Sequence, residues 1–134
     1  MTVVVGVNAF HGDAAAAAVR DGHIAGAVAE ERFTRRKHQA GFPARALAWA
    51  VDEACGGDWR AVEALCVARK PRAYLLRKML HVLRHPGSAG RALGRIRNLR
   101  AVEGLRGRAA RELGIGEDQL PPLVGVEHHL AHVA

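Results

Sequence analysis

The chain has 134 residues, of which 49% are hydrophobic and 25% are charged, and its formal net charge is +7. This length suits one domain with a modest core, and the apolar share argues against disorder. The N-terminal residues have no basic region before their apolar run, so we expect no secretory leader, and no run approaches the ~20 apolar residues that span a bilayer. Cys55 and Cys66 lack a metal-binding or redox spacing, so we expect free thiols in a cytoplasmic protein that has no membrane partner.

The N-terminal third predicts three strands. Residues 2–8 contain a valine run without polar alternation, which is typical of a strand covered on both faces. Residues 14–19 and 23–30 flank Asp21 and Gly22, and an Asp-Gly pair between two apolar runs strongly indicates a hairpin. The alanines at the start of the second run favour a helix by propensity, but the turn is the better evidence, so we predict strands.

A charged segment and a helix follow. Residues 30–38 are too charged to be buried, and we expect a loop that faces solvent or an anionic ligand. After Pro43, apolar side chains at helical spacing, Leu47 and Val51 among them, predict a helix that ends at Gly56. Residues 62–68 predict another apolar strand.

Residues 69–114 predict a basic helical insertion. Within residues 69–111, Glu103 is the only acidic residue and Tyr74 the only aromatic one. Such a field attracts polyanions, but the aromatic side chains on which single-stranded nucleic acids stack are missing. A basic RNA- or anion-binding module is therefore an alternative function, and nucleic acid is a less favoured partner. The helices are expected at residues 72–83, 91–99 and 101–113.

The last predicted strand, residues 123–126, leads into a histidine cluster. His128 and His132 would lie on one face of a helix that begins after Glu127, whereas His129 would point about 100° away. Two imidazoles at this spacing can converge on one cation, and ligands of open α/β sheets gather beyond the carboxyl ends of strands. We therefore favour a metal site at His128 and His132 over histidines that are solvated or satisfied in a core.

This order of elements predicts the α/β class with a mixed sheet. Three strands with a hairpin, followed by alternating helix and strand, resemble the ribonuclease H-like half of the actin-like ATPase fold.

Three ordered motifs resemble the nodulation- and antibiotic-type O-carbamoyltransferases. They span residues 6–15, 30–43 and 127–132, with the arginine-rich insertion before the last. The resemblance implies an actin-like transferase domain related to the threonylcarbamoyl-transferring tRNA-modification proteins. In complete members, a second domain forms carbamoyl-adenylate from ATP and carbamoyl phosphate, and the actin-like domain moves the carbamoyl group onto a hydroxyl.

The resemblance also implies a metal. His128 and His132 match the metal-binding histidines of the family, usually assigned to iron. Neutral imidazole equally suits zinc, nickel and copper, so the residues themselves indicate only a divalent metal.

The turn after the first strand is the expected catalytic segment. Carbamoyl transfer needs a general base and an electrophile, and His11 or Asp13 could be the base. Gly12 would allow the backbone close to a ligand.

The charged loop is the expected substrate-binding segment. Its candidate residues are Arg35, Lys37 and His38, for which a merely solvated loop is an equal alternative.

Length is the departure from the family. We expect residues 1–134 to be the N-terminal part of a longer transferase, inactive alone, whose remaining portion follows it or comes from another chain. The expected acceptor is a small molecule with a hydroxyl that the sequence does not identify. A protein that transfers threonylcarbamoyl to tRNA is the second alternative.

Overall fold

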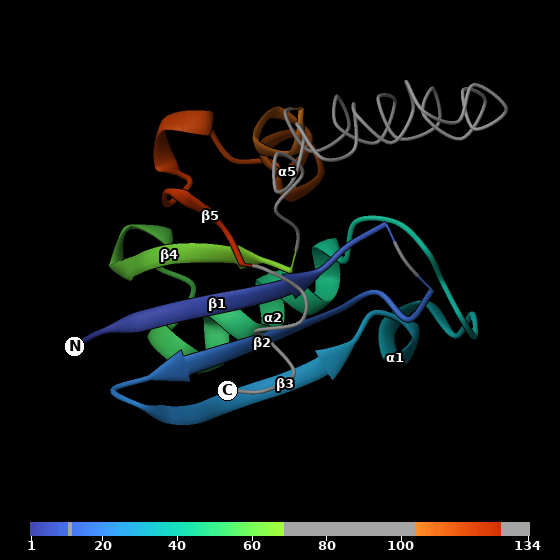
Figure 1. Cartoon of the computed structure of the whole chain (residues 1–134), viewed down its shortest axis with the longest axis horizontal. Helices are drawn as coiled ribbons and strands as arrows, with labels where there is room; N and C mark the ends of the chain where they lie inside the picture. The colour runs from blue at the N-terminus through green and yellow to red at the C-terminus, as the bar shows by residue number, and fades with distance from the viewer. Residues whose placement is uncertain (11, 69–103, 127–134) are drawn as a thin grey trace, which may run out of the picture.

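A computed structural model describes residues 1–10, 12–68 and 104–126. Its centre is a five-stranded mixed sheet with the strand order β3-β2-β1-β4-β5 (Figure 1). The first three strands form an antiparallel meander, and the last two run parallel to the first. The α/β class with a mixed sheet is thus confirmed. The strands are β1 (Val3–Asn8), β2 (Ala15–Arg20), β3 (His23–Ala29), β4 (Val62–Val67) and β5 (Leu123–Gly125).

The predicted Asp-Gly hairpin joins β2 to β3. Asp21 (φ 49°) and Gly22 (φ 80°) both have left-handed backbones, as a two-residue hairpin turn requires. The carboxylate of Asp21 also accepts a hydrogen bond from the backbone N–H of Thr2 at 2.8 Å. The alanine run therefore forms a strand, as we predicted. Its members Ala16 and Ala18 are buried, and their small side chains let a helix approach the sheet closely.

Helix α2 (Ala44–Cys55) covers one face of this meander (Figure 1). It begins after Pro43 and ends at Gly56, whose φ of 65° gives the left-handed cap that the sequence indicated. The predicted apolar positions are buried against the sheet, so the amphipathic pattern is confirmed. The buried residues of α2 are Ala46, Leu47, Ala50, Val51 and Ala54.

Expectations about residues 30–38 are wrong in two respects. Glu31–Thr34 form a short helix, α1, so the segment is not wholly a loop. Glu30 is only 4% exposed, although we expected it in solvent. The reason is the start of α2, where the Glu30 carboxylate accepts hydrogen bonds from the backbone N–H groups of Ala46 (2.8 Å) and Arg45 (3.4 Å). A helix N-terminus stabilises an anion that would otherwise be costly to bury.

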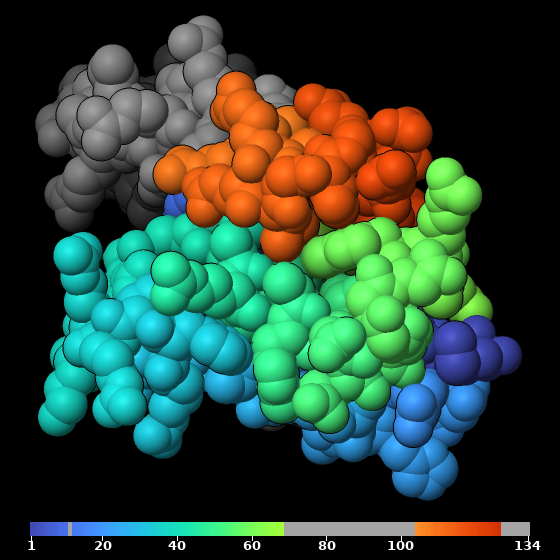
Figure 2. Space-filling view, turned by 180° about the vertical axis from the view of Figure 1, so that it is seen from behind, coloured from blue at the N-terminus to red at the C-terminus, as the bar shows by residue number. Residues whose placement is uncertain are grey.

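The C-terminal end of the predicted insertion is helix α5 (Leu105–Leu113), which lies beside α2 (Figure 2). It ends at Gly114 (φ 69°), as predicted. The expected helices at residues 72–83 and 91–99 lie outside the described residues. Two short 3-10 helices precede the last strands, η1 (Trp59–Ala61) before β4 and η3 (Glu117–Gln119) before β5.

Arg106 of α5 connects this helix to the approach to β5. Its guanidinium donates hydrogen bonds to the backbone carbonyls of Glu117, Leu120 and Pro121 at 2.7 to 3.1 Å. One charged side chain thus satisfies several carbonyls that the turn leaves without strand partners. In the three described segments, every helix is too short or too polar to cross a membrane.

Candidate functional site

The turn that joins β1 to β2 is held in an unusual backbone conformation. Phe10 (φ 62°) and Asp13 (φ 65°) are both left-handed. Asn8, at the end of β1, donates a hydrogen bond from Nδ2 to the carbonyl of Asp13 at 3.0 Å. The N–H of Phe10 donates to the carbonyl of Gly41 at 2.8 Å. These bonds close the turn and attach it to the segment before α2.

The loop after α1 runs beside this turn. The N–H of Ala14 donates to the carbonyl of Gln39 at 3.1 Å, and the carbonyl of Ala14 accepts from the N–H of Glu30 at 2.8 Å. Arg35 (φ 59°) caps the short helix with a left-handed backbone, and His38 (φ 53°) is left-handed too. The two backbone hydrogen bonds of Ala14 therefore connect the turn to Glu30, before α1, and to Gln39, in the loop after it.

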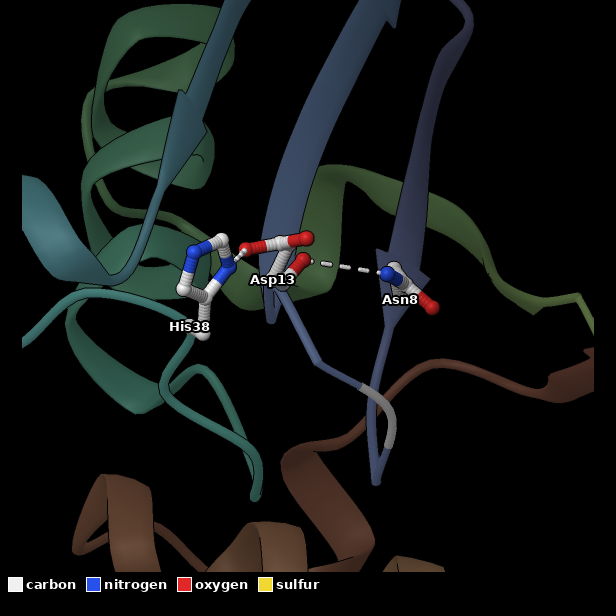
Figure 3. Close-up of polar contacts among 3 residues, drawn as sticks. All are labelled: Asn8, Asp13 and His38. Carbon is white, nitrogen blue, oxygen red and sulfur yellow. Dashed lines mark hydrogen bonds and ion pairs between the residues drawn. The ribbon is translucent and has the colours of Figure 1, made fainter.

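Turn and loop bring Asp13 and His38 into contact (Figure 3). His38 Nδ1 lies 3.0 Å from Asp13 Oδ1, with Asn8 on the other side of Asp13. The His38 side chain is 82% exposed and that of Asp13 is 66% exposed. An exposed pair of this kind contributes little to the free energy of unfolding. A histidine beside a carboxylate can nevertheless bind a ligand or accept a proton.

The predicted basic residues line a hollow of their own. Arg35 and Lys37 border about 420 Å³ of space together with Arg32 and Glu31. Three cations around one carboxylate leave a net positive site that suits an anion. Among residues 1–10, 12–68 and 104–126, no atom would lie within 4 Å of a Cβ built at Gly12, so these residues leave the space beside the β1–β2 turn open.

The remaining predicted site residues, His11, His128 and His132, lie outside the described residues. Val126 precedes the histidine cluster, and its N–H donates to the carbonyl of Val67 at 2.8 Å. Because β1, β4 and β5 are parallel, β5 ends with Gly125 at the sheet edge at which β1 also ends with Asn8. In the part of the chain that the structure describes, no three His, Cys, Asp or Glu residues are grouped so as to hold a metal ion.

Two residues near this site carry no signal in the sequence. One is Glu30, whose buried carboxylate holds the start of α2. The other is Arg108 of α5, whose guanidinium lies 5.1 Å from the centre of the Phe10 ring, a cation–π contact between the basic insertion and the turn. No local pattern marks either contact, because the partners are distant in the chain.

A second hollow lies on the face of the sheet opposite α2. It has a volume of about 570 Å³ and an almost entirely apolar lining of small side chains, which include Gly6, Ala15 and Ala17. Cys66 also lines it, and burial raises the pKa of this thiol. A raised pKa leaves less of the reactive thiolate near neutral pH, so Cys66 is a poor nucleophile. Both cysteines are free.

The fold and the site define an α/β domain with a polar candidate site at the carboxyl edge of its sheet. A sequence profile of the family described as carbamoyltransferase N-terminus matches residues 3–134. The chain belongs to this family of transferases, which confirms the resemblance in its motifs.

One curated relative has a name that states no function. The chain is 34% identical over 140 aligned positions to a Synechocystis protein that bears the name uncharacterized protein sll1178. The alignment covers all of the chain and 23% of that protein, so the chain spans about a quarter of its relative's length.

Proposed function

We propose that this domain serves the transfer of a carbamoyl group from carbamoyl-adenylate to a hydroxyl of a small-molecule acceptor. The observation that carries the proposal is the family match over residues 3–134. The contact between Asp13 and His38 adds acid–base chemistry at the edge where β1 ends. Carbamoyl-adenylate would come from ATP and carbamoyl phosphate, as the family resemblance implies.

The topology supports an assignment to the ribonuclease H-like half of an actin-like fold. An antiparallel meander on one side of β1 and two parallel strands on the other agree with the order of elements that suggested this fold. In sheets of this kind ligands bind outside the carboxyl ends of parallel strands. Asn8 at the end of β1 and Gly125 at the end of β5 both lie at that edge.

The charges of the loop suit the proposed donor. An adenylate is an anion, and Arg35 and Lys37 border a hollow with a positive balance of charge. Guanidinium binds phosphate oxygens in pairs, and an ammonium acts as a point charge beside them. In this proposal, Arg35 and Lys37 bind the phosphate of the donor, and Gly12 borders the open space beside that phosphate.

His128 and His132 would hold a divalent metal, iron by resemblance. Their donor chemistry fits, because neutral imidazole is a good ligand for first-row transition metals. When bound, the cation would polarise the carbonyl group or hold the phosphate.

Carbamoyl transfer is tested with the complete polypeptide, ATP, carbamoyl phosphate and a panel of hydroxyl compounds. We expect acceptor that gains one carbamoyl group, together with release of AMP. Arg35→Ala and Lys37→Ala should raise the KM for the donor roughly tenfold each, since each removes one charge-assisted contact worth about 1.4 kcal/mol. Arg60→Ala is the matched control, because Arg60 is an exposed arginine of η1 away from this hollow.

Two outcomes would replace the proposal. Salt-sensitive RNA binding without carbamoyl transfer would favour a basic RNA-binding module. The net charge of +7 would then serve to attract the RNA phosphates. Modification of tRNA, with no product from small hydroxyl compounds, would favour a threonylcarbamoyl transferase.

The metal assignment is tested with single alanine variants of the complete polypeptide. Replacing His128 or His132 should reduce bound metal by at least about tenfold, because each removes a ligand. The His129 variant is the control and should keep its metal, as that side chain would point to another helix face. The metal content of each variant is measured by elemental analysis after iron loading. Loss of metal with His129 replaced and retention with His132 replaced would contradict the assignment.

A further inference from the structure

The contact between Asp13 and His38 has the geometry of a carboxylate that orients an imidazole. We propose that His38 is the general base that deprotonates the acceptor hydroxyl, and that Asp13 is the positioning residue that holds its ring. This inference rests on the proposed carbamoyl transfer and assigns different roles to two residues that the sequence offered as base and as substrate ligand.

The tautomer follows from the contact. An ionised carboxylate can only accept hydrogen bonds, so Nδ1, at 3.0 Å from Asp13 Oδ1, carries the hydrogen of a neutral His38 ring. The other nitrogen, Nε2, then has the lone pair that a base needs. The His38 side chain is 82% exposed, so a solute can reach it.

The backbone places both partners. Asp13 (φ 65°) and His38 (φ 53°) are left-handed, a conformation in which Asp and His are enriched among non-glycine residues. The hydrogen bond from Asn8 Nδ2 holds the Asp13 carbonyl, and the bond from Ala14 N to Gln39 O joins the residues next to the pair. The backbone that carries both side chains is therefore held in place by hydrogen bonds.

Nε2 of His38 accepts the proton of the hydroxyl while the hydroxyl oxygen forms a bond to the carbamoyl carbon. The bond from that carbon to the phosphate oxygen breaks, and its electron pair leaves with AMP. Asp13 stabilises the imidazolium that forms, and the proton then passes to solvent.

The variants are chosen to preserve the backbone. Asparagine tolerates left-handed positions, so Asp13→Asn and His38→Asn should both fold. We expect His38→Asn to lower kcat about 10²- to 10⁴-fold, the range of a lost general base. Asp13→Asn should lower it about 10²-fold or more, since an amide NH₂ can face Nδ1 and favour the wrong tautomer. The KM for the donor should stay nearly constant.

Asp21→Asn is the matched control. Asp21 is also left-handed (φ 49°), and its replacement by asparagine also removes one carboxylate. It lies, however, in the β2–β3 hairpin turn. Its kcat should equal that of the unchanged protein. His38→Gly with added imidazole should regain activity, because glycine accepts the backbone and leaves room for the free base.

Nitrogen-15 NMR of the histidine rings tests the geometry independently of activity. We expect the hydrogen on Nδ1 of His38, and its transfer to Nε2 in Asp13→Asn. Full kcat in both asparagine variants would overturn the role of base while leaving carbamoyl transfer intact. Failure of the unchanged protein to transfer carbamoyl would overturn the proposed function and the base together, and the ring signal would then report only the contact.

Discussion

Glu30→Ala is expected to lower the free energy of unfolding by about 3 kcal/mol. Glu30 is 4% exposed, and its carboxylate accepts hydrogen bonds from Ala46 N at 2.8 Å and Arg45 N at 3.4 Å. Alanine would leave buried donors unsatisfied, at about 1 to 3 kcal/mol, and would remove an anion from a helix N-terminus, at about 0.3 to 2 kcal/mol. Equilibrium unfolding in urea measures the change.

Two further variants separate charge from hydrogen bonding. Glu30→Gln keeps one acceptor oxygen and should cost only about 1 kcal/mol, as it loses the charge and one acceptor. Glu31→Ala is the control, because Glu31 is adjacent, partly exposed and not among the residues whose side chains hold the start of α2. Glu31→Ala should change the free energy of unfolding by no more than about 0.5 kcal/mol. Equal losses at Glu30 and Glu31 would contradict a capping role for the buried carboxylate.

Gly26→Val is expected to destabilise the protein by about 2 to 3 kcal/mol. A Cβ built at Gly26 of β3 would lie 2.9 Å from both Cη2 and Cζ3 of the Trp49 ring in α2. A real side chain there forces the ring or the helix to move, which is the usual cost of overpacking. Thermal and urea unfolding would report it.

A double-mutant cycle isolates the steric conflict. Gly26→Ala should be unfavourable beside Trp49 and close to neutral in a Trp49→Ala background, with a coupling of about 1 kcal/mol or more. Gly6→Ala is the matched control: Gly6 is also inside a strand, but its nearest described neighbour, the Ala17 carbonyl oxygen, would be 3.9 Å from the new Cβ. A similar loss at both glycines would point to the strand backbone instead of the Trp49 ring.

Much of the fold can be predicted from short-range signals. The Asp21-Gly22 turn sets the hairpin because two consecutive positive φ angles are costly for most other pairs. The spacing of Leu47 and Val51 marks the buried side of α2, because helix periodicity repeats within a few residues. The motifs also identified the carbamoyltransferase family, which the profile match over residues 3–134 confirms.

The contacts within the candidate site depend on the tertiary structure. Asp13 and His38 are 25 residues apart and meet only because the β1–β2 turn and the loop after α1 are hydrogen-bonded at Ala14. From the sequence alone, Glu30 is expected at the surface. It is buried because α2 begins beside it with N–H groups that need an acceptor. Local sequence determines what each segment can form, whereas the sheet topology decides which distant polar groups become neighbours, because burial and pairing are properties of the assembled chain.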